Sequence, residues 1–340
     1  MRILAIETSC DETAVAVVED GRQVISSVVR SQIETHALYG GVVPEIASRQ
    51  HIESITILAE EALSKANMKK QDVDAIAVTY APGLIGALLV GVGFAKAVAI
   101  GLDKPLVPVH HIRGHIAANY IAFPDLKPPF LCLVVSGGHT LIVDVKGYTE
   151  FEILGSTRDD AAGEAFDKCA RVLGLPYPGG AAMDKLAAGG DTTKYKLPRA
   201  KVADNELDMS FSGLKTAVIN TVHNAEQKGE TIDGASLAAS FSAAVADTLV
   251  PRTATALEKT GYKKLAVAGG VAANGFLRRE LETMAEKLAC ELYLPPLSLC
   301  GDNAAMIGAQ AYFEYLDGNC AGADLNAYAT MPIDKLFGNK

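Results

Sequence analysis

The sequence predicts an α/β protein in which one strand-and-helix unit occurs twice. The first copy has three strand-like runs, with the hairpin turn Asp20-Gly21 before the third: residues 2–6, 14–18 and 23–30. The second copy has the same order, with Lys146-Gly147 at its turn: residues 131–135, 140–145 and 151–154. Helix-like segments follow in both halves. Because the residue identities barely match, we expect a structural duplication rather than a literal repeat.

The segments between these strands predict the remaining elements. Apolar residues at helical spacing predict a helix over 44–67, a short buried strand is expected at 75–78, and the Gly- and Ala-rich run 83–101 predicts a tightly packed buried helix. Later we expect a helix over 159–173, with Asp160 as its possible cap, and then an irregular excursion over 179–205. A strand over 264–268 and two further helices, over 275–288 and 304–316, complete the pattern.

The length and the charge limit the possible organisation. A chain of 340 residues exceeds the usual single domain of about 100–200 residues, so two domains are expected. We expect a first lobe made of residues 1–108 and 301–340, and a second lobe, 109–300, that carries a histidine pair and the glycine-rich loops. The net charge of −9 counts against independent binding of nucleic acid, because an acidic surface without a local basic patch repels phosphates.

The location of the protein follows from what its sequence lacks. No apolar run reaches the roughly 18 residues that a bilayer requires, and the first residues do not have the basic, apolar and small-residue order of a signal peptide. The six cysteines are scattered and form no C-x-x-C pair, which favours reduced thiols. We therefore expect a cytoplasmic protein without membrane contact.

A histidine pair is the first candidate for chemistry. In a helix, a spacing of four residues puts His111 and His115 one turn apart, so that both imidazoles reach one cation. Neutral imidazole suits zinc, iron or nickel. Spacing alone leaves two ordinary packing histidines as an equal alternative. A metalloprotease is disfavoured, because Ile112 stands where the H-E-x-x-H motif has its general base.

Paired glycines follow two of the expected strands, at Gly137-Gly138 and Gly269-Gly270. Without a Cβ atom, backbone N–H groups there can face a phosphate. Either pair alone is more simply a tight turn, but two pairs in a duplicated α/β unit favour a nucleotide in a cleft between two lobes. The sequence contains neither a Walker A loop nor a clear G-x-G-x-x-G motif.

Charged residues supply further candidates. Five acids near glycines are possible ligand contacts: Asp11, Glu12, Asp167, Asp184 and Asp302. Of these, Asp184 is placed to accept a hydrogen bond from a ribose hydroxyl. Each alone is better explained by a helix cap or a solvated charge, and N-capping is the strongest alternative for Asp302. Four cations and a tyrosine within 194–201 are a candidate RNA contact, for which a solvated loop is the commoner explanation.

Eight segments, in order and in register from residue 3 to about 315, carry a family resemblance: Ile6–Thr13, His111–His115, Val135–Thr140, Ala165–Lys168, Tyr177–Gly180, Phe211–Lys215, Ala268–Asn274 and Cys300–Asn303. They resemble the tRNA threonylcarbamoyladenosine transferase family of the TsaD type, formerly called O-sialoglycoprotein endopeptidase. The resemblance implies two RNase H-like lobes around a nucleotide cleft, as in actin, Hsp70 and sugar kinases.

The resemblance also implies a reaction. The threonylcarbamoyl group of threonylcarbamoyl-adenylate would be moved to N6 of the adenosine 3′ of the anticodon, in tRNAs that read ANN codons, and AMP would leave. The adenylate is already activated, so no covalent enzyme intermediate is required. The implied metal would act as a Lewis acid and a template. The implied partners are tRNA, a paralogous subunit of the same fold (TsaB type) and a small ATPase (TsaE type).

The family roles fall on particular residues of this chain. The resemblance implies that His111, His115 and Asp302 ligate iron (Fe²⁺) or zinc. The threonylcarbamoyl and phosphate end of the intermediate would lie along five residues: Val134, Val135, Ser136, Gly137 and Gly138. The adenosine and its ribose would be held by four others: Asp167, Gly180, Asp184 and Asn274. Asp11 and Glu12 would face the reacting centre. His139, Glu12 and the departing phosphate are the candidates to take the proton from the amine.

Three other functions compete with this hypothesis. A phosphotransferase of the sugar- or acetate-kinase type on the same fold would phosphorylate a small molecule and would not need the histidine pair. A nucleotide-gated interaction protein would bind partners without turnover. A metallopeptidase ranks last. We also hypothesise that tRNA is held by an assembled surface, because the chain is acidic and has one basic run.

Overall fold

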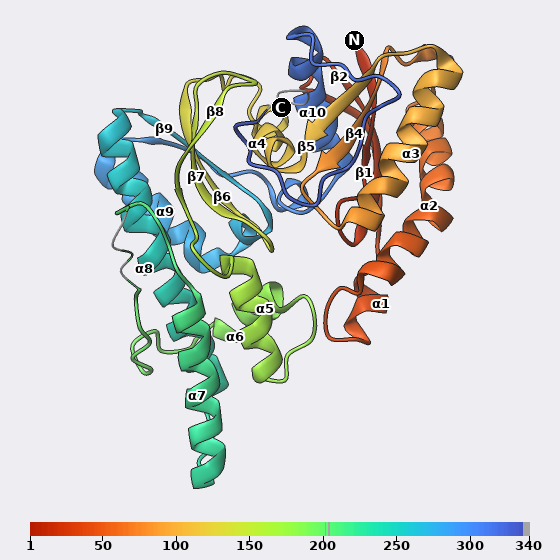
Figure 1. Cartoon of the computed structure of the whole chain (residues 1–340). Helices are drawn as coiled ribbons and strands as arrows, with labels where there is room; N and C mark the ends of the chain where they lie inside the picture. Colours follow the sequence, from red (N-terminus) through yellow and green to blue (C-terminus); the bar gives the residue numbers. More distant parts are fainter. Residues whose placement is uncertain (201, 203–204, 336–340) are drawn as a thin grey trace. The chain divides into compact units, whose positions relative to one another are not determined.

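The computed structural model describes residues 1–200, 202 and 205–335, which form two compact units (Figure 1). Unit 1 comprises Met1–Pro128, Val145–Glu152 and Pro295–Lys340, and unit 2 comprises Pro129–Asp144 and Ile153–Leu294. The division differs from the expected boundary after residue 108. Helix α4 (His111–Ala122) packs on helix α10 (Ala304–Leu316) and on strand β5 of unit 1, so the histidine pair lies in unit 1 and not in the second lobe.

Unit 1 contains a mixed sheet with the strand order β3-β2-β1-β4-β5. Its strands are β1 (Arg2–Glu7), β2 (Glu12–Glu19), β3 (Gln23–Ser31), β4 (Ala75–Ala81) and β5 (Leu106–His110). The β1-β2 and β2-β3 pairs are antiparallel, whereas β1-β4 and β4-β5 are parallel. The turn at Asp20-Gly21 joins β2 to β3, as expected, and both of its residues have positive φ.

Both faces of this sheet are covered by helices (Figure 1). Successive side chains of a strand point to opposite faces. Leu4 and Ile6 of β1 therefore pack in the cluster with α2 and α3, while Ile3 and Ala5 pack in the cluster with α4 and α10. The helices on the first face are α2 (Pro44–Lys65) and α3 (Ile85–Leu102); the short α1 (Ile33–Ala37) and the 3-10 turn η1 (Lys70–Asp72) flank α2 along the chain.

Helix α3 is only partly buried, in contrast to the expectation of a fully buried helix. Its small residues Ala87, Gly91 and Ala95 face the core, but Leu89 and Ile100 are about half and two-thirds exposed. The helix is also long and apolar enough to cross a membrane by length and composition alone, contrary to the expectation that no such segment exists. A core helix passes the same test, and α3 packs on β4 and α2.

Unit 2 repeats the sheet of unit 1, with the order β10-β9-β6-β7-β8. Its strands are β6 (Phe130–Val135), β7 (Thr140–Val145), β8 (Phe151–Ser156), β9 (Lys264–Ala268) and β10 (Glu291–Tyr293). Numbered within each unit, both sheets have the strand order 3-2-1-4-5, and the third strand lies at one edge. The same strand order in both sheets confirms the expected duplication of one α/β unit.

The helices of unit 2 depart from expectation in three places. They are α5 (Ala162–Val172), α6 (Gly179–Ala187), α7 (Ser212–Lys228), α8 (Gly234–Thr260) and α9 (Gly275–Leu288), with the 3-10 turn η2 (Gly270–Ala273). Helix α6 lies in the segment 179–205 that was expected to be irregular. Asp160 does not cap α5, because Ala161 holds the cap position and Asp160 forms ion pairs with Lys168 and Lys215. The long helices α7 and α8 were not anticipated from the sequence.

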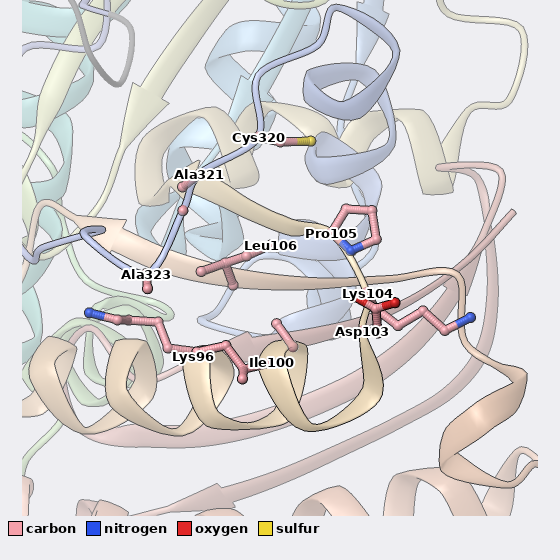
Figure 2. A pocket seen from close by; sticks show the side chains of 11 residues that line it. Lys96, Ile100, Asp103, Lys104, Pro105, Leu106, Cys320, Ala321 and Ala323 are labelled. Atoms are coloured by element: carbon pink, nitrogen blue, oxygen red, sulfur yellow. The ribbon is translucent and has the colours of Figure 1, made fainter.

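A segment after α10, residues 320–335, runs back across unit 1. The 3-10 turn η3 (Leu297–Leu299) leads into α10, and the chain then crosses β5, where the Ala321 N–H donates to the Leu106 carbonyl at 2.8 Å. Figure 2 shows this crossing, with an open pocket of about 310 Å³ beside Lys96 and Asp103 of the α3 end. None of the site residues expected from the sequence lines this pocket.

Candidate metal centre and adenylate site

Unit 1 places two histidines in the first turns of α4. The helix starts directly after β5, and His110 caps it, because its Nδ1 accepts the Ile112 N–H at 3.2 Å. His111 and His115 lie one turn apart on the same face, with ring centroids separated by 4.6 Å. Both side chains are buried. The helix expected from the four-residue spacing is therefore present.

Asp302 completes a cluster with the two histidines. Its Oδ1 lies 3.6 Å from Nε2 of His111 and 3.2 Å from Nε2 of His115, and one ligand atom from each of the three residues lies within 4.8 Å of the others. The capping role considered for Asp302 is performed instead by Asn303, whose Oδ1 accepts the Met306 N–H at the start of α10. A residue 187 positions after the second histidine is thus brought to the pair by the packing of α10 on α4.

The donor set fits a transition-metal ion. Neither ring nitrogen of His115 makes a hydrogen bond within the described part of the chain, although the side chain is about 1% exposed. A buried polar atom without a hydrogen bond costs about 1–3 kcal/mol, which a coordinated cation removes. Two imidazoles and a carboxylate are the mixed N/O set that zinc and iron accept, and three protein ligands leave coordination positions for a substrate.

Glu7 orients His111 from the side opposite Asp302. It ends β1, is fully buried, and its Oε2 lies 3.1 Å from Nδ1 of His111. The carboxylate is held in turn by the Ser9 N–H and the Thr79 hydroxyl, each at 2.5 Å. A carboxylate on Nδ1 selects the tautomer that leaves Nε2 as the ligand. Glu7 was not among the site residues expected from the sequence, although a charged residue at the end of a buried strand is a usable signal.

The charges of this cluster move each other's pKa. Burial lowers the pKa of His111, but the Glu7 and Asp302 carboxylates outweigh burial and raise that pKa to about 9. Burial raises the pKa of Glu7, and the nearby His111 outweighs it, so the pKa of Glu7 lies below its ordinary value. In the metal-free protein, His111 is therefore a buried imidazolium at neutral pH, and a metal must displace its proton.

Asp11 and Glu12 lie in the same unit, in the loop between β1 and β2 and at the start of β2. Burial, followed by the charges of Asp302 and Asp11, raises the pKa of Glu12 to about 9. Glu12 Oε1 accepts the Ser31 hydroxyl at 3.0 Å. Burial also raises the pKa of the Cys10 thiol, which argues against a thiolate nucleophile in this loop.

Another buried histidine, to which the sequence assigned no role, holds the same loop. His51 of α2 is fully buried, its Nδ1 lies 2.7 Å from the Thr13 hydroxyl, and its Nε2 lies 2.9 Å from the Cys10 carbonyl. Burial lowers the pKa of His51, so it is neutral at pH 7. The backbone of the loop that carries Asp11 is therefore held by α2.

Unit 2 contains the residues expected to hold the intermediate. Val134 and Val135 end β6 and are buried. Ser136 begins a tight turn, in which its backbone N–H donates to the His139 carbonyl at 2.8 Å. Two glycines let other backbone approach this turn. A Cβ on Gly163 would lie 2.5 Å from the Ser136 carbonyl oxygen, and one on Gly269 would lie 2.5 Å from the Val135 carbonyl oxygen.

The turn itself is open. A Cβ on Gly137 or Gly138 would meet no atom within 4 Å. Its backbone is therefore accessible to a ligand, as expected for a phosphate-binding turn. His139 is partly exposed at the end of the turn, in unit 2, whereas the metal cluster lies in unit 1.

The expected adenosine residues lie around the starts of α6 and α9. Asp167 Oδ1 accepts the N–H groups of Gly179 and Gly180 at 2.8 and 3.2 Å, and Asp184 accepts the Gly275 N–H at 3.1 Å. Both carboxylates thus position helix N-termini.

The side-chain amide of Asn274 uses its oxygen within the protein and has its nitrogen available. Its Oδ1 caps α9 by accepting the Leu277 N–H at 2.9 Å. Its buried Nδ2 has no hydrogen-bond partner among the described residues. A buried donor of this kind is the group expected to bind a ligand.

The basic run offers little free charge. Lys194 pairs with Asp233 at 2.8 Å, and Arg199 pairs with Asp247 at 2.6 Å. Lys201 lies outside the described residues. Two of the four cations are therefore neutralised within unit 2, which weakens the case for an RNA contact here.

Comparison with known proteins decides the family. The model of the TsaD family, tRNA N6-adenosine threonylcarbamoyltransferase, matches residues 23–309. The chain belongs to this family. It is 55% identical over 333 residues to the tRNA N6-adenosine threonylcarbamoyltransferase of Clostridium botulinum (strain 657 / Type Ba4). The matched residues cover 98% of each chain. It is 54% identical over 332 residues to the Moorella thermoacetica protein of the same name, with 98% of this chain and 97% of that one covered.

Solved structures support the fold of this TsaD-family chain. HypF from T. kodakarensis has a TM-score of 0.61 and 16% identity, with 93% of this chain and 48% of that chain covered. Component A of (R)-2-hydroxyglutaryl-CoA dehydratase from Acidaminococcus fermentans has a TM-score of 0.53 and 18% identity, with 93% and 99% covered. Identities this low show the fold alone. The fold is thus the expected α/β fold, with two sheets of the same strand order.

Proposed function

We propose that this chain transfers the threonylcarbamoyl group of threonylcarbamoyl-adenylate to N6 of the adenosine 3′ of the anticodon, in tRNAs that read ANN codons. The observation that carries the proposal is the 55% identity over 98% of the chain to a tRNA N6-adenosine threonylcarbamoyltransferase. The bond that forms joins N6 to the carbamoyl carbon. The bond that breaks joins that carbon to the phosphate oxygen, AMP leaves with the bonding electrons, and N6 loses one proton.

His111, His115 and Asp302 are the residues that would hold a divalent iron or zinc ion. The ion would supply Lewis-acid stabilisation of the charge that develops on the acyl group and the leaving phosphate. Glu7 would keep Nε2 of His111 directed at the site, as the 3.1 Å contact indicates. The two ring nitrogens of His115, which make no hydrogen bond among the described residues, support this assignment.

Unit 2 would hold the adenylate. The open turn at Gly137-Gly138 offers backbone to the phosphate, and the Asn274 amide offers a buried donor to the adenosine. Asp167 and Asp184 would keep the starts of α6 and α9 in place while accepting from the ribose. The energetic effect is positioning, because the adenylate is already activated.

Two of the three candidates remain to accept the proton from N6: His139 and the departing phosphate. Glu12 is disfavoured as a base in the metal-free protein, because its pKa of about 9 keeps it protonated at pH 7. Neutralisation of Asp302 by a bound cation would lower this pKa and return Glu12 to the candidates.

The proposed partners are tRNA, a paralogous subunit of the same fold (TsaB type) and a small ATPase (TsaE type), in the cytoplasm. The net charge of −9 and the internal pairing of Lys194 and Arg199 support a tRNA surface that this chain does not provide alone. The kinase alternative gains no support from the relatives.

The proposal is tested by a reconstituted transfer. Purified chain, its partners, an adenylate-forming enzyme, ¹⁴C-threonine and unmodified tRNA are combined, and label in tRNA is counted. We expect label that depends on this chain and is absent from a tRNA whose target adenosine is replaced by guanosine. No label with any partner set, together with ATP-dependent phosphorylation of a sugar or acetate, would replace the transferase by the kinase alternative.

A further inference from the structure

We infer that residues 331–335 clamp the back of helix α4, and that Arg113 is the positioning residue through which this segment holds the metal ligands His111 and His115. The inference rests on the metal site proposed above. It adds a role for Arg113, which lies between the two ligands in the sequence, and for residues 331–335, which follow Asp302 by about 30 positions.

Arg113 connects the helix to the segment. Its guanidinium is 3% exposed and donates three hydrogen bonds to backbone carbonyls of the segment. Nε and Nη2 donate to the Ile333 carbonyl at 2.9 and 2.7 Å, and Nη2 also donates to the Lys335 carbonyl at 3.0 Å. The planar guanidinium donates to two carbonyls and a carboxylate from three nitrogen atoms in a fixed fork, whereas an ammonium group donates from a single nitrogen.

The remaining face of Arg113 is also occupied. Nη1 forms a buried ion pair with Glu314 of α10 at 2.9 Å, and the guanidinium lies over the Phe151 ring, 4.8 Å from its centroid. Gln310 and Asn319 donate to the two oxygens of Glu314. A buried charge is tolerated only when it is paired and hydrogen-bonded in this way, so losing the carbonyls of the segment would leave the guanidinium undersatisfied.

His110 forms a second, independent connection. Its Nδ1 accepts the Ile112 N–H and caps α4, so its Nε2 carries the proton and donates to the Met331 carbonyl at 3.0 Å. Met331 is held in addition by the Tyr80 hydroxyl, whose oxygen lies 3.0 Å from its Sδ. The cap of the helix and its third residue are therefore both fixed by the same short segment.

Helix geometry relates this clamp to the metal ligands. At 100° per residue, Arg113 points about 160° away from both His111 and His115. The segment therefore supports the helix face opposite to the ligands. On another side, Gly114 lies so close to α10 that a Cβ there would come within 2.7 Å of Ile307. Helix α4 is held between α10 and the segment, which leaves its first turns little freedom to rotate.

The test compares metal binding in four purified, metal-free chains: wild type, a chain that ends at Thr330, Arg113→Lys and Ile333→Ala. The last variant is the matched control, because it removes a buried side chain but keeps the backbone carbonyl that Arg113 contacts. Co²⁺ affinity is measured by competition with a chelator, and the ligand-field absorption of bound Co²⁺ reports the coordination geometry. Circular dichroism and thermal melting of each chain show which variants fold.

We expect Co²⁺ binding about 10–100-fold weaker, with a changed ligand-field spectrum, in the truncated chain and in Arg113→Lys, as for other groups that orient metal ligands. Ile333→Ala should melt at a lower temperature but keep an affinity and a spectrum close to the wild-type ones. If the truncated chain does not fold, Arg113→Lys decides.

Two results would overturn the clamp. One is a folded Arg113→Lys chain with wild-type affinity and spectrum. The other is an equal loss of affinity in Ile333→Ala, which would make the effect one of general packing. A wild-type chain that binds no Co²⁺ would instead overturn the metal site, and the clamp with it; transfer to tRNA by wild type is tested separately.

Discussion

The Glu7 carboxylate lies 3.1 Å from Nδ1 of His111, and this contact decides which nitrogen of the ring faces Asp302. Glu7 is fully buried at the end of β1, whereas Asp302 is about one-fifth exposed. The two acids thus have different roles on one imidazole. Glu7 orients the ring, and Asp302 is available as a ligand beside Nε2.

Replacing Glu7 by glutamine should weaken metal binding by about 10–100-fold, because the neutral amide orients His111 less strongly and lowers the basicity of the ring. The measurement is Zn²⁺ affinity by competition with a fluorescent chelator. Glu53→Gln, the same change at an exposed position of α2, is the control. Equal affinities in all three chains would show that Glu7 has no orienting role.

Metal affinity should rise with pH between about 6 and 9. In the metal-free chain the pKa of His111 is raised to about 9, so binding must release a proton. Below that pKa, each decrease of one pH unit should lower the metal affinity by up to about tenfold. In Glu7→Gln the rise should shift toward lower pH, because the carboxylate that raises the pKa is absent. Isothermal titration in two buffers of different ionisation enthalpy counts the protons, and a flat profile from pH 6 to 8 would contradict the assignment.

Glu12→Gln should stabilise the metal-free chain at high pH. The folded-state pKa of Glu12 is raised to about 9 from an ordinary value of 4.5, so the folded state prefers the protonated acid. The contribution of Glu12 to the free energy of unfolding is therefore lost as pH rises from about 4.5 through 9. We expect the variant to exceed wild type by at least about 1 kcal/mol at pH 9 and to match it near pH 4.5. Urea unfolding with chelator present measures this, and a constant difference across pH would be the contrary result.

Much of the fold follows from local pattern. Alternation and turn chemistry predicted the hairpins of both sheets, because the Asp20-Gly21 signal and the buried face act within a few residues. The exposure of Leu89 and the assignment of α4 to unit 1 were not predicted. Both depend on which elements pack on a helix, and apolar content alone does not encode that.

The candidate site divides in the same way. The four-residue spacing of His111 and His115 is a local signal, while Asp302 was assigned as a metal ligand only through the family resemblance. The contact partners of Glu7 and Arg113 could not be predicted, because both depend on tertiary contacts, in the case of Arg113 with residues more than 200 positions away. Sequence spacing carries no information about such partners.

Asn274→Asp separates ligand binding from stability. The aspartate keeps an oxygen to cap α9 and suits a helix N-terminus, so the free energy of unfolding should change by less than about 0.5 kcal/mol. It loses the buried Nδ2 donor, so affinity for AMP should fall about tenfold. Asn274→Ala, which loses both groups, should lower stability as well. Calorimetric AMP binding and urea unfolding give the two numbers. Unchanged AMP affinity in Asn274→Asp would remove this residue from the adenosine site.

The most direct measurement compares threonylcarbamoyl transfer to tRNA with bound metal in wild type, the double variant His111→Ala/His115→Ala, and the control His223→Ala, whose histidine is exposed on α7. Label in tRNA and metal per chain are determined on the same preparations. We predict that wild type and control carry metal and transfer label, and that the double variant loses the metal and at least about 100-fold of the rate. A folded double variant that transfers label at the wild-type rate without metal would contradict the account.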